Sequence, residues 1–373
     1  MVIAIDARPM LTEPRTGVGE YTYELLSHLF QIDQDNTYIL FANKFHATHD
    51  LPFQHHANVS WVSTRIPNKL FHASLFFFRR PRLDRYVVRR AGVDRVDVWF
   101  SPNLLFTSLS PQVKHLLTIH DLSYHHYPSF FSQKGRLWHR AVRPRVQIAR
   151  ASHIFTPSLH TKRDVEVVYG ASSVSVLSPG VCSHIMSKDR RTISDVQQAY
   201  ALPKHFLLYL GTLEPRKNIE GILEAYQNSS YLKKHTELIF AGSLGYKGHM
   251  YTDMIAQVSG ARYIGYVDEE DKHALYTLAQ AFVYPSLYEG FGLPVLEASV
   301  CGTPVITSHR SSLPEVVGES GSLVQPYNIS VLQAQMERVV HMNSEALSVS
   351  DIQTQQFSWD GTALALLEHM TTV

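Results

Sequence analysis

The sequence contains only two cysteines, Cys182 and Cys301, among 373 residues. Two cysteines cannot form a disulfide framework, and their scarcity favours a reducing compartment. No run approaches the roughly 18 consecutive apolar residues that a membrane-spanning helix needs. The first residues also lack the basic start and apolar core of a signal peptide. We therefore expect a cytoplasmic protein without a membrane span.

Extremes of composition are absent as well. Hydrophobic residues make up 45% of the chain, aromatic residues 11% and charged residues 18%. This balance excludes a wholly disordered, collagen-like or coiled-coil protein and provides material for large cores. At about 100–200 residues per domain, the length predicts two domains.

Charge is distributed unevenly, although the formal net charge is only +1. Residues 1–185 carry 21 Lys and Arg against 13 Asp and Glu, whereas residues 186–373 carry 13 against 20. A basic half joined to an acidic half indicates two parts with different partners. Nucleic acid, an anionic membrane or a phosphorylated substrate would each explain the basic half. Because no nucleic-acid-binding module is recognisable, we expect no nucleic acid partner.

The most basic segment spans residues 65–95, with nine Lys and Arg and two Asp. Its basic residues are interleaved with bulky apolar ones: Phe71, Leu75, Phe76, Phe77 and Phe78. Such a segment suits the headgroup region of an anionic membrane, and it equally suits a buried helix with a solvated basic face. The sequence therefore leaves open a peripheral contact with the inner membrane face through residues 65–95.

Short apolar or β-branched runs alternate with amphipathic patterns along the chain. Runs typical of strands occur at 2–7, 38–42, 59–63, 96–101, 116–120, 154–158 and 174–177, and again at 206–210, 238–241, 262–266, 281–284, 304–306 and 321–324. Helical patterns include 19–30, 133–151, 219–226, 268–278, 294–300, 330–340 and 359–370. This alternation predicts an α/β fold of two Rossmann-like domains.

A polar stretch at residues 187–196 separates the two halves, and we place the linker there. The expected domains are residues 1–186 and residues 187–358. Ligands of open α/β sheets bind beyond the carboxyl ends of the strands. Two such domains facing each other would form a deep cleft for a substrate.

The densest pattern lies at residues 284–304, which read YPSLYEGFGLPVLEASVCGTP. A predicted strand ends near Tyr284, a loop with Gly292 follows, and Pro294 suits the first turn of a helix. Free N–H groups and the helix dipole make such a helix start a site for anions. Two acids flank it. Taken singly, Glu289 could belong to a surface turn, and Glu297 could be favoured by the dipole in the first helical turn.

Together these residues resemble the E-x7-E signature of retaining glycosyltransferases, notably family 4 with the GT-B fold. Four further segments carry the resemblance: Ile5-Asp6-Ala7-Arg8 with Arg15-Thr16-Gly17-Val18-Gly19, Thr118-Ile119-His120-Asp121, Gly211-Thr212-Leu213-Glu214-Pro215-Arg216-Lys217-Asn218, and Tyr263-Ile264-Gly265-Tyr266-Val267-Asp268. The helix at 359–373 resembles the family's closing helix, which crosses back to the first domain. The resemblance implies an N-terminal acceptor domain and a C-terminal nucleotide-sugar donor domain that face each other across a deep cleft.

The resemblance also implies roles for single residues. A basic pair entering a helix is disfavoured by the dipole, which hints at an anionic ligand, and in the family such residues bind the donor diphosphate. Thr212 stands where many members carry arginine, so Arg216 is the candidate substitute. Glu289 would bind sugar hydroxyls, Glu297 would bind ribose hydroxyls, and His120 would lie near the transferred sugar. The expected catalytic residues are His120, Glu289, Arg216 and Lys217, and the other donor-binding candidates are Gly17, Gly19, Val267, Phe291, Gly292, Leu293, Val295 and Glu297.

Two patterns raise the question of a metal. Asp33-Gln34-Asp35 matches the D-x-D motif of other glycosyltransferases, but it follows an amphipathic helix and is typical of a surface turn. His125 and His126 come shortly after His120, without an acid or a cysteine at ligand spacing. Since family members usually need no metal in the protein, we expect neither a metal nor a cofactor.

The expected function is transfer of a hexose, foremost mannose from GDP-mannose, to a lipid-linked glycan in bacterial polysaccharide or O-antigen assembly. Family likeness implies retention of the anomeric configuration by front-face attack. A UDP-hexose-dependent enzyme of the same fold, a nucleotide-sugar isomerase and a non-catalytic glycan- or membrane-binding module with a relic site remain alternatives. A Rossmann oxidoreductase is disfavoured because no complete G-x-G-x-x-G is followed by an acid about 20 residues later.

Overall fold

The computed structural model describes residues 1–12, 15–43, 51–186, 191–342 and 356–372. The chain divides into two compact units. Unit 1 comprises Met1–Leu122, Gln133–Gly180 and Ser358–Val373, and unit 2 comprises Ser123–Ser132 and Val181–Phe357. Each unit contains one parallel sheet accompanied by helices. The expected pair of α/β, Rossmann-like domains is confirmed.

The division between the units comes earlier in the chain than the polar stretch suggests. Unit 1 ends at Gly180, and unit 2 includes helix α8 (Ser183–Met186) and the short segment Ser123–Ser132. Residues 187–190 of the expected linker lie outside the described residues, and its end is part of helix α9 (Ile193–Ala199). Only Val196 of α9 is buried. Val196 belongs to the core of unit 2, so the end of the expected linker is part of that unit.

The sheet of unit 1 has seven strands in the order β3-β2-β1-β4-β5-β6-β7. All pairings among these strands are parallel. The strands are β1 (Val2–Asp6), β2 (Thr37–Asn43), β3 (Val59–Thr64), β4 (Val98–Ser101), β5 (Lys114–Thr118), β6 (His153–Thr156) and β7 (Val174–Val176).

Strand β1 is buried on both faces, and its alternating side chains enter two cores. Ile3 and Ile5 belong to one core, and Ala4 belongs to the other with Phe71 of α2 and Leu83 of α3. The helices of unit 1 are η1 (Arg8–Leu11), α1 (Gly17–Ile32), α2 (Asn68–Ala73), η2 (Ser74–Phe78), α3 (Leu83–Ala91), α5 (Gln133–Ala141), α6 (Pro144–Arg150), α7 (Leu159–Tyr169) and α18 (Trp359–Thr372).

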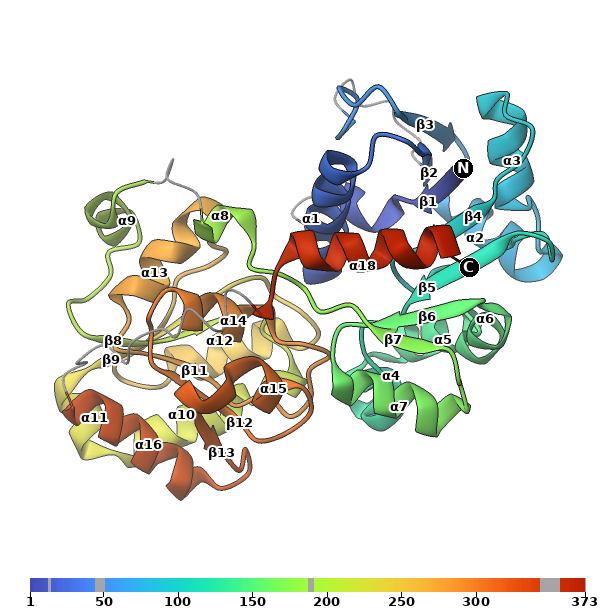
Figure 1. Ribbon diagram of the computed structural model, residues 1–373. Coiled ribbons are helices and arrows are strands. Elements are labelled where there is room, and N and C mark those ends of the chain that lie inside the picture. The colour runs from blue at the N-terminus through green and yellow to red at the C-terminus, as the bar shows by residue number, and fades with distance from the viewer. Residues whose placement is uncertain (13–14, 44–50, 187–190, 343–355, 373) are drawn as a thin grey trace. The chain divides into compact units, whose positions relative to one another are not determined.

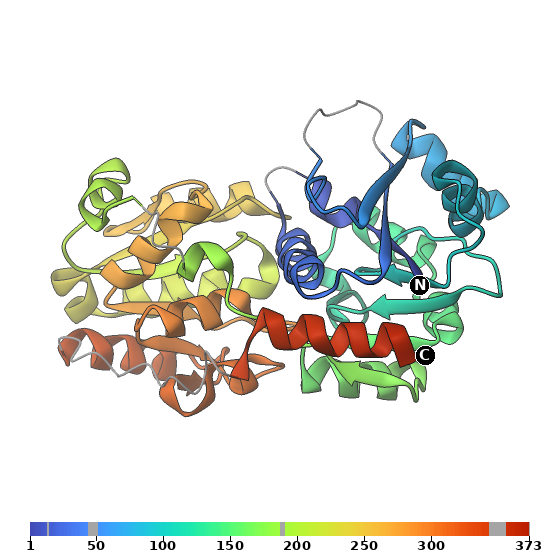
Figure 2. The same cartoon turned by 45° about the horizontal axis from the view of Figure 1, so that its top comes forward.

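Helix α18 returns the chain to unit 1 and lies against α1, as Figure 1 and Figure 2 both show. The rings of Trp359 and Tyr21 meet edge to face at 5.4 Å, and His28 Nδ1 lies 2.6 Å from a carboxylate oxygen of Asp360. An added Cβ at Gly180 would overlap the backbone nitrogen of Trp359. The closing helix thus extends the core of unit 1; residue 373 lies outside the described part.

The sheet of unit 2 has six parallel strands in the order β10-β9-β8-β11-β12-β13. The strands are β8 (Phe206–Leu210), β9 (Glu237–Ala241), β10 (Ala261–Tyr263), β11 (Ala281–Tyr284), β12 (Val305–Ser308) and β13 (Ser322–Val324). The remaining helices of unit 2 are α4 (Ser123–His126), η3 (Pro128–Phe130), η4 (Pro215–Lys217), α10 (Ile219–Asn228), α11 (Ser230–His235), α12 (Gly248–Ala256), η5 (Glu269–Asp271), α13 (Lys272–Leu278), α14 (Leu293–Val300), α15 (Leu313–Val317), η6 (Gly318–Ser320) and α16 (Ile329–His341).

The basic segment at residues 65–95 folds as α2, the π-helical turn η2 and α3. Phe71 is fully buried, whereas Leu70, Phe77 and Phe78 are 64%, 71% and 74% exposed. The segment therefore combines a buried apolar residue, Phe71, with exposed apolar and basic residues. Among the described residues, no helix has the length and apolarity that crossing a membrane requires.

The strand order places one switch point in each sheet. In unit 1 the order reverses between β1 and β4, and in unit 2 it reverses between β8 and β11. Ligands of open α/β sheets bind beyond the carboxyl ends of strands at such a point. In unit 2 these ends lead directly to Arg216, Lys217 and Glu289.

The two glycines at the start of α1, Gly17 and Gly19, differ in the space around them. An added Cβ at Gly19 would lie 2.9 Å from the carbonyl oxygen of Pro9, whereas one at Gly17 meets nothing within 4 Å. We expect Gly19→Ala to cost about 1–3 kcal/mol of stability, because the overpacked backbone must shift. Gly17→Ala, as the control, leaves stability unchanged. Urea unfolding followed by fluorescence tests this, and equal midpoints for both variants would contradict it.

Candidate active site

The segment from β11 to α14 has the strand–loop–helix layout expected from the sequence. Gly292 precedes α14 with a φ of 109°, in a region that favours glycine, and an added Cβ there would lie 2.8 Å from Leu313 Cδ2. Helix α14 begins at Leu293, so Glu297 lies in its second turn and the first turn carries no acid. The helix dipole acts mainly over the first turn, so it does not explain why an acidic residue occupies position 297.

Serines that follow β12 hold the loop in place. The backbone N–H of Glu289 donates to Ser311 Oγ at 2.9 Å. Ser312 Oγ lies within hydrogen-bond distance of the carbonyl oxygens of Glu289 and Phe291, at 3.0 and 2.7 Å, and its single hydroxyl hydrogen can donate to either. Ser312 is fully buried. These bonds fix the backbone on both sides of the Glu289 side chain.

Glu289 lies at the centre of a buried charge cluster. Its Oε1 accepts a hydrogen bond from Lys217 Nζ at 2.5 Å, and its Oε2 accepts one from Arg216 Nη1. Lys217 Nζ also donates to the hydroxyl of Tyr284 and lies 4.7 Å from the centroid of that ring. Arg216 Nε pairs with Glu214 Oε1 at 2.6 Å. Two cations thus face two carboxylates, and their formal charges balance.

Burial and neighbouring charges shift the pKa values of the groups in this cluster. Burial raises the pKa of Glu289, but Arg216 and Lys217 outweigh it and bring that pKa down to about 2. Burial and the nearby Arg216 lower the pKa of Lys217, while Glu289 opposes this. Burial also raises the pKa of Tyr284 well above its ordinary value. At neutral pH, Glu289 is therefore an ionised acceptor and Tyr284 a neutral phenol.

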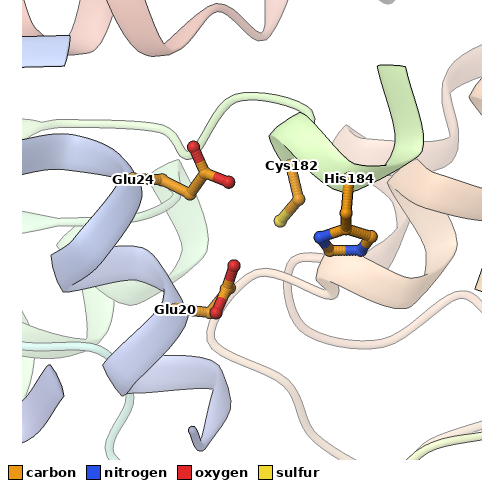
Figure 3. Close-up of side chains that lie close together, drawn as sticks. All are labelled: Glu20, Glu24, Cys182 and His184. Carbon is orange, nitrogen blue, oxygen red and sulfur yellow. The ribbon is translucent and has the colours of Figure 1, made fainter. Parts of the chain in front are cut away.

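Glu297 lies in a second polar group of unit 2. Its side chain is 3% exposed, and its Oε2 accepts a hydrogen bond from the hydroxyl of Tyr276 at 2.9 Å. His184 Nε2 lies 3.8 Å from Oε1, beyond hydrogen-bond distance. Figure 3 shows His184 and Cys182 projecting from the region of α8. Burial and Glu297 raise the pKa of Tyr276 well above its ordinary value, so it remains a donor to the carboxylate.

His120 follows β5 in unit 1, two residues beyond the end of the strand. Its Nε2 lies 2.8 Å from the carbonyl oxygen of Pro102, and its ring meets that of Tyr21 edge to face at 4.8 Å. A carbonyl only accepts, so Nε2 carries the proton, and in the neutral ring Nδ1 is an acceptor. Burial lowers the pKa of His120, which favours that neutral ring.

Helix α1 begins at Gly17, and Thr16 Oγ1 caps it by accepting from the N–H of Gly19 at 3.3 Å. Glu20 and Glu24 project from α1 one turn apart (Figure 3). Because Tyr21 of the same helix contacts His120, the start of α1 and the segment after β5 are neighbours. Unit 1 thus places His120 beside α1, the helix whose first turn carries Gly17 and Gly19.

A buried ion pair holds the turn after β1. Arg8 Nε and Nη2 donate to the two carboxylate oxygens of Asp6 at 2.7 and 2.5 Å, and Nη2 also donates to the carbonyl oxygen of Phe106 at 3.0 Å. Asp6 is fully buried. This bidentate pair positions the segment that leads to α1.

The other predicted residues are mainly backbone candidates. Val267 and Val295 are buried in the core of unit 2, and the ring of Phe291 packs edge to face on Phe357. Leu293 is the first residue of α14. A ligand could meet the main chain of Val267 and Val295, but their side chains serve packing.

The D-x-D match forms a turn. Asp33 ends α1, and its carboxylate accepts from the backbone N–H of Asp35 at 3.0 Å and from the hydroxyl of Tyr38 at 2.5 Å. His125 and His126 lie on α4, where the His126 ring is 5.6 Å from that of Tyr288. The Asp33 carboxylate therefore has a structural use in this turn.

Several partners of the site escaped prediction from the sequence. They are Tyr276, Tyr284, His184, Ser311 and Ser312. Tyr284 carried a usable signal, because it ends a strand at the switch point. The others come from segments far along the chain, and nothing in their sequence context marks them.

The sequence comparisons identify the family. Residues 15–183 match the model described as Glycosyltransferase Family 4, and residues 191–356 match that of Glycosyl transferases group 1. The chain belongs to the group 1 glycosyltransferases. This enzyme is 29% identical over 381 residues to O-antigen chain mannosyltransferase B of Escherichia coli, covering 95% of this chain and 96% of the relative.

Two further proteins are similar to this glycosyltransferase along most of its length. It is 25% identical over 318 residues to O-antigen chain mannosyltransferase RfbU of Salmonella typhimurium, covering 83% of each. Its fold is similar to that of sucrose-phosphate synthase from Thermosynechococcus elongatus, with a TM-score of 0.76, 20% identity and coverage of 99% and 98% of the two chains. The two Rossmann-like units are those of the GT-B fold.

Proposed function

We propose that this glycosyltransferase moves mannose from GDP-mannose to a lipid-linked glycan, with retention of the anomeric configuration and without a metal in the protein. Relatives named as O-antigen chain mannosyltransferases support the sugar and the class of acceptor. The observation that carries the catalytic part is the pairing of Arg216 and Lys217 with Glu289 at the switch point of the donor unit.

Arg216 and Lys217 suit the departing nucleoside diphosphate. Its negative charge grows as the bond to the sugar breaks, and positive groups in a buried site stabilise that charge. Within the described residues, the contacts of Lys217 with Glu289 and Tyr284 account for two of its three N–H donors. The third can meet a phosphate oxygen, and the start of α14 adds backbone donors.

Glu289 suits binding of sugar hydroxyls better than proton transfer. A carboxylate with a pKa of about 2 is a poor base at neutral pH. In the proposed front-face reaction, the acceptor hydroxyl attacks from the side on which the diphosphate leaves, and its proton passes to the leaving phosphate. Glu289 then orients the donor, and Nδ1 of the neutral His120 accepts from a hydroxyl of the transferred sugar.

Nucleotide titration tests the donor. We expect calorimetry of the purified chain to show selective binding of GDP over UDP and ADP, equal with and without magnesium, because Arg216 and Lys217 supply the diphosphate charge. Selective binding of UDP would instead favour a UDP-hexose donor within the same reaction class. Absence of binding by all three would favour a non-catalytic module with a relic site. Consumption of GDP-mannose without acceptor would reveal an isomerase.

We also propose peripheral contact with an anionic membrane through residues 65–95. The exposed Phe77 and Phe78 and the neighbouring arginines support this. High salt should release the protein from membrane fractions, because exposed charges are screened. Free solubility at low salt would contradict the contact.

A further inference from the structure

Unit 1 contains a cavity of about 240 Å³, and no residue that lines it belongs to the candidate active site. Its walls come from the turn η2, from the loop between β4 and β5, and from the end of α5 with α6. Leu75, Phe76, Phe106, Val142 and Val146 make much of the lining apolar. The volume lies just below the range of small-molecule pockets, about 300–1,000 Å³, and suits one slender apolar chain.

Exposed arginines line the same cavity. They are Arg79, Arg143 and Arg150. The Arg143 guanidinium lies 4.9 Å from the centroid of the Phe76 ring, so charge and apolar surface meet directly. Deeper in the lining, burial lowers the pKa of His115 to about 4, which leaves it neutral. Positive charge is therefore confined to the exposed side, as an anionic headgroup requires.

The backbone at two of these arginines is strained. Arg79 has a φ of 51° and Arg143 a φ of 56°, both in the left-handed region that side chains other than glycine rarely adopt. Such conformations are energetically unfavourable and cluster at ligand sites. Arg79 also follows a π-helical turn, a feature frequent at functional sites.

A buried polar side chain holds the wall of the cavity in place. Gln147 lines the cavity and is 8% exposed. Its Nε2 donates to the carbonyl oxygens of Leu105 and Val142 at 2.9 and 2.7 Å, which fixes the amide orientation. Its Oε1 has no partner within the described residues. Gln147 thus ties the loop after β4 to the end of α5 beside the cavity.

We propose that this cavity binds one hydrocarbon chain of an anionic lipid and that Arg79 and Arg143 hold its phosphate. Phe77, Phe78 and Leu137, all more than two-thirds exposed, would enter the membrane around it. The inference rests on the proposed membrane contact of residues 65–95. The cavity adds a defined lipid site to that contact. Attachment of the protein to the membrane then depends on an inserted hydrocarbon chain as well as on charge.

Titration of the full chain with dodecyl phosphate tests the site. We expect dodecyl phosphate to bind and inorganic phosphate not to bind. Uncharged dodecyl maltoside should bind at least about 10-fold more weakly than dodecyl phosphate, since charged hydrogen bonds contribute about 1.5–3 kcal/mol. Val146→Trp should fill the cavity and weaken binding about 10-fold or more. Val167→Trp is the control, because Val167 on α7 is 84% exposed and does not line the cavity.

A second pair of variants separates the headgroup from the chain. Arg143→Glu should remove the preference for dodecyl phosphate over dodecyl maltoside, whereas Arg163→Glu on α7 should not. Equal binding by Val146→Trp and wild type, or equal affinity for inorganic phosphate and dodecyl phosphate, would overturn the site.

Vesicles distinguish a membrane lipid from a free amphiphile. We expect wild type to bind phosphatidylglycerol vesicles and Val146→Trp to be released from them at lower salt. Identical salt release of the two would overturn the inserted chain while leaving the surface contact intact. An unchanged circular dichroism spectrum and unfolding midpoint for every variant verify that unit 1 is folded. Unchanged nucleotide binding, which depends on unit 2, keeps this result separate from failure of the proposed donor.

Discussion

Replacing Glu289 with glutamine should lower turnover about 10²–10³-fold while nucleoside diphosphate binds at least as tightly as to wild type. The wild-type carboxylate neutralises Lys217 and Arg216 inside a buried cluster. Glutamine keeps the shape of the side chain but removes its negative charge. The two cations then carry a larger net positive charge, which attracts the diphosphate. The sugar, however, loses a charged acceptor, and misplacement of a reacting group by about 1 Å costs about 10²-fold. Steady-state kinetics and nucleotide calorimetry on the same variant measure both effects.

The matched control is Glu214→Gln. Glu214 pairs with the same Arg216 at 2.6 Å, but its side chain is 24% exposed and it is not expected to contact sugar. We expect this variant to retain turnover within about threefold, because solvent reaches this pair and can replace part of the lost interaction. Equal losses of turnover in the two variants would mean that Glu289 acts only by holding Arg216.

The central strands of both sheets could be predicted because nearly all their residues are buried. β8 and β11 have the bounds expected from their apolar runs. The helical pattern at 133–151 failed in detail: it breaks into α5 and α6 because Arg143 adopts a left-handed conformation before Pro144. A pattern of apolar residues does not reveal that one residue has a positive φ. The residue before a proline is only biased away from the helical conformation.

The sequence predicted which residues make up the candidate site, but not which of them contact each other. Arg216, Lys217 and Glu289 stand out in the sequence because each follows a strand end. Their mutual pairing depends on β8 and β11 being neighbours, although more than 70 residues separate them in the chain. The pairing of Glu297 with Tyr276 likewise joins α14 to α13. Such contacts follow from strand order, which the alternation of elements alone does not determine.

The second large effect concerns Glu297. We expect Glu297→Gln to weaken nucleotide binding about 10-fold or more while turnover at saturating donor changes little. A carboxylate can accept from both ribose hydroxyls, and bonds to a charged acceptor contribute about 1.5–3 kcal/mol. Glutamine offers one acceptor oxygen, and its amide nitrogen faces either the ribose or the hydroxyl of Tyr276.

Tyr276→Phe and Glu224→Gln complete this test. Removing the Tyr276 hydroxyl takes away the donor that holds Glu297 Oε2 at 2.9 Å, so Tyr276→Phe should weaken nucleotide binding less than Glu297→Gln does. Glu224, exposed on α10, is the charge-matched control and should behave as wild type. If Glu297→Gln lowered turnover without raising the donor KM, Glu297 would act on the sugar. The assignment of Glu289 to the sugar and Glu297 to the ribose would then have to be exchanged.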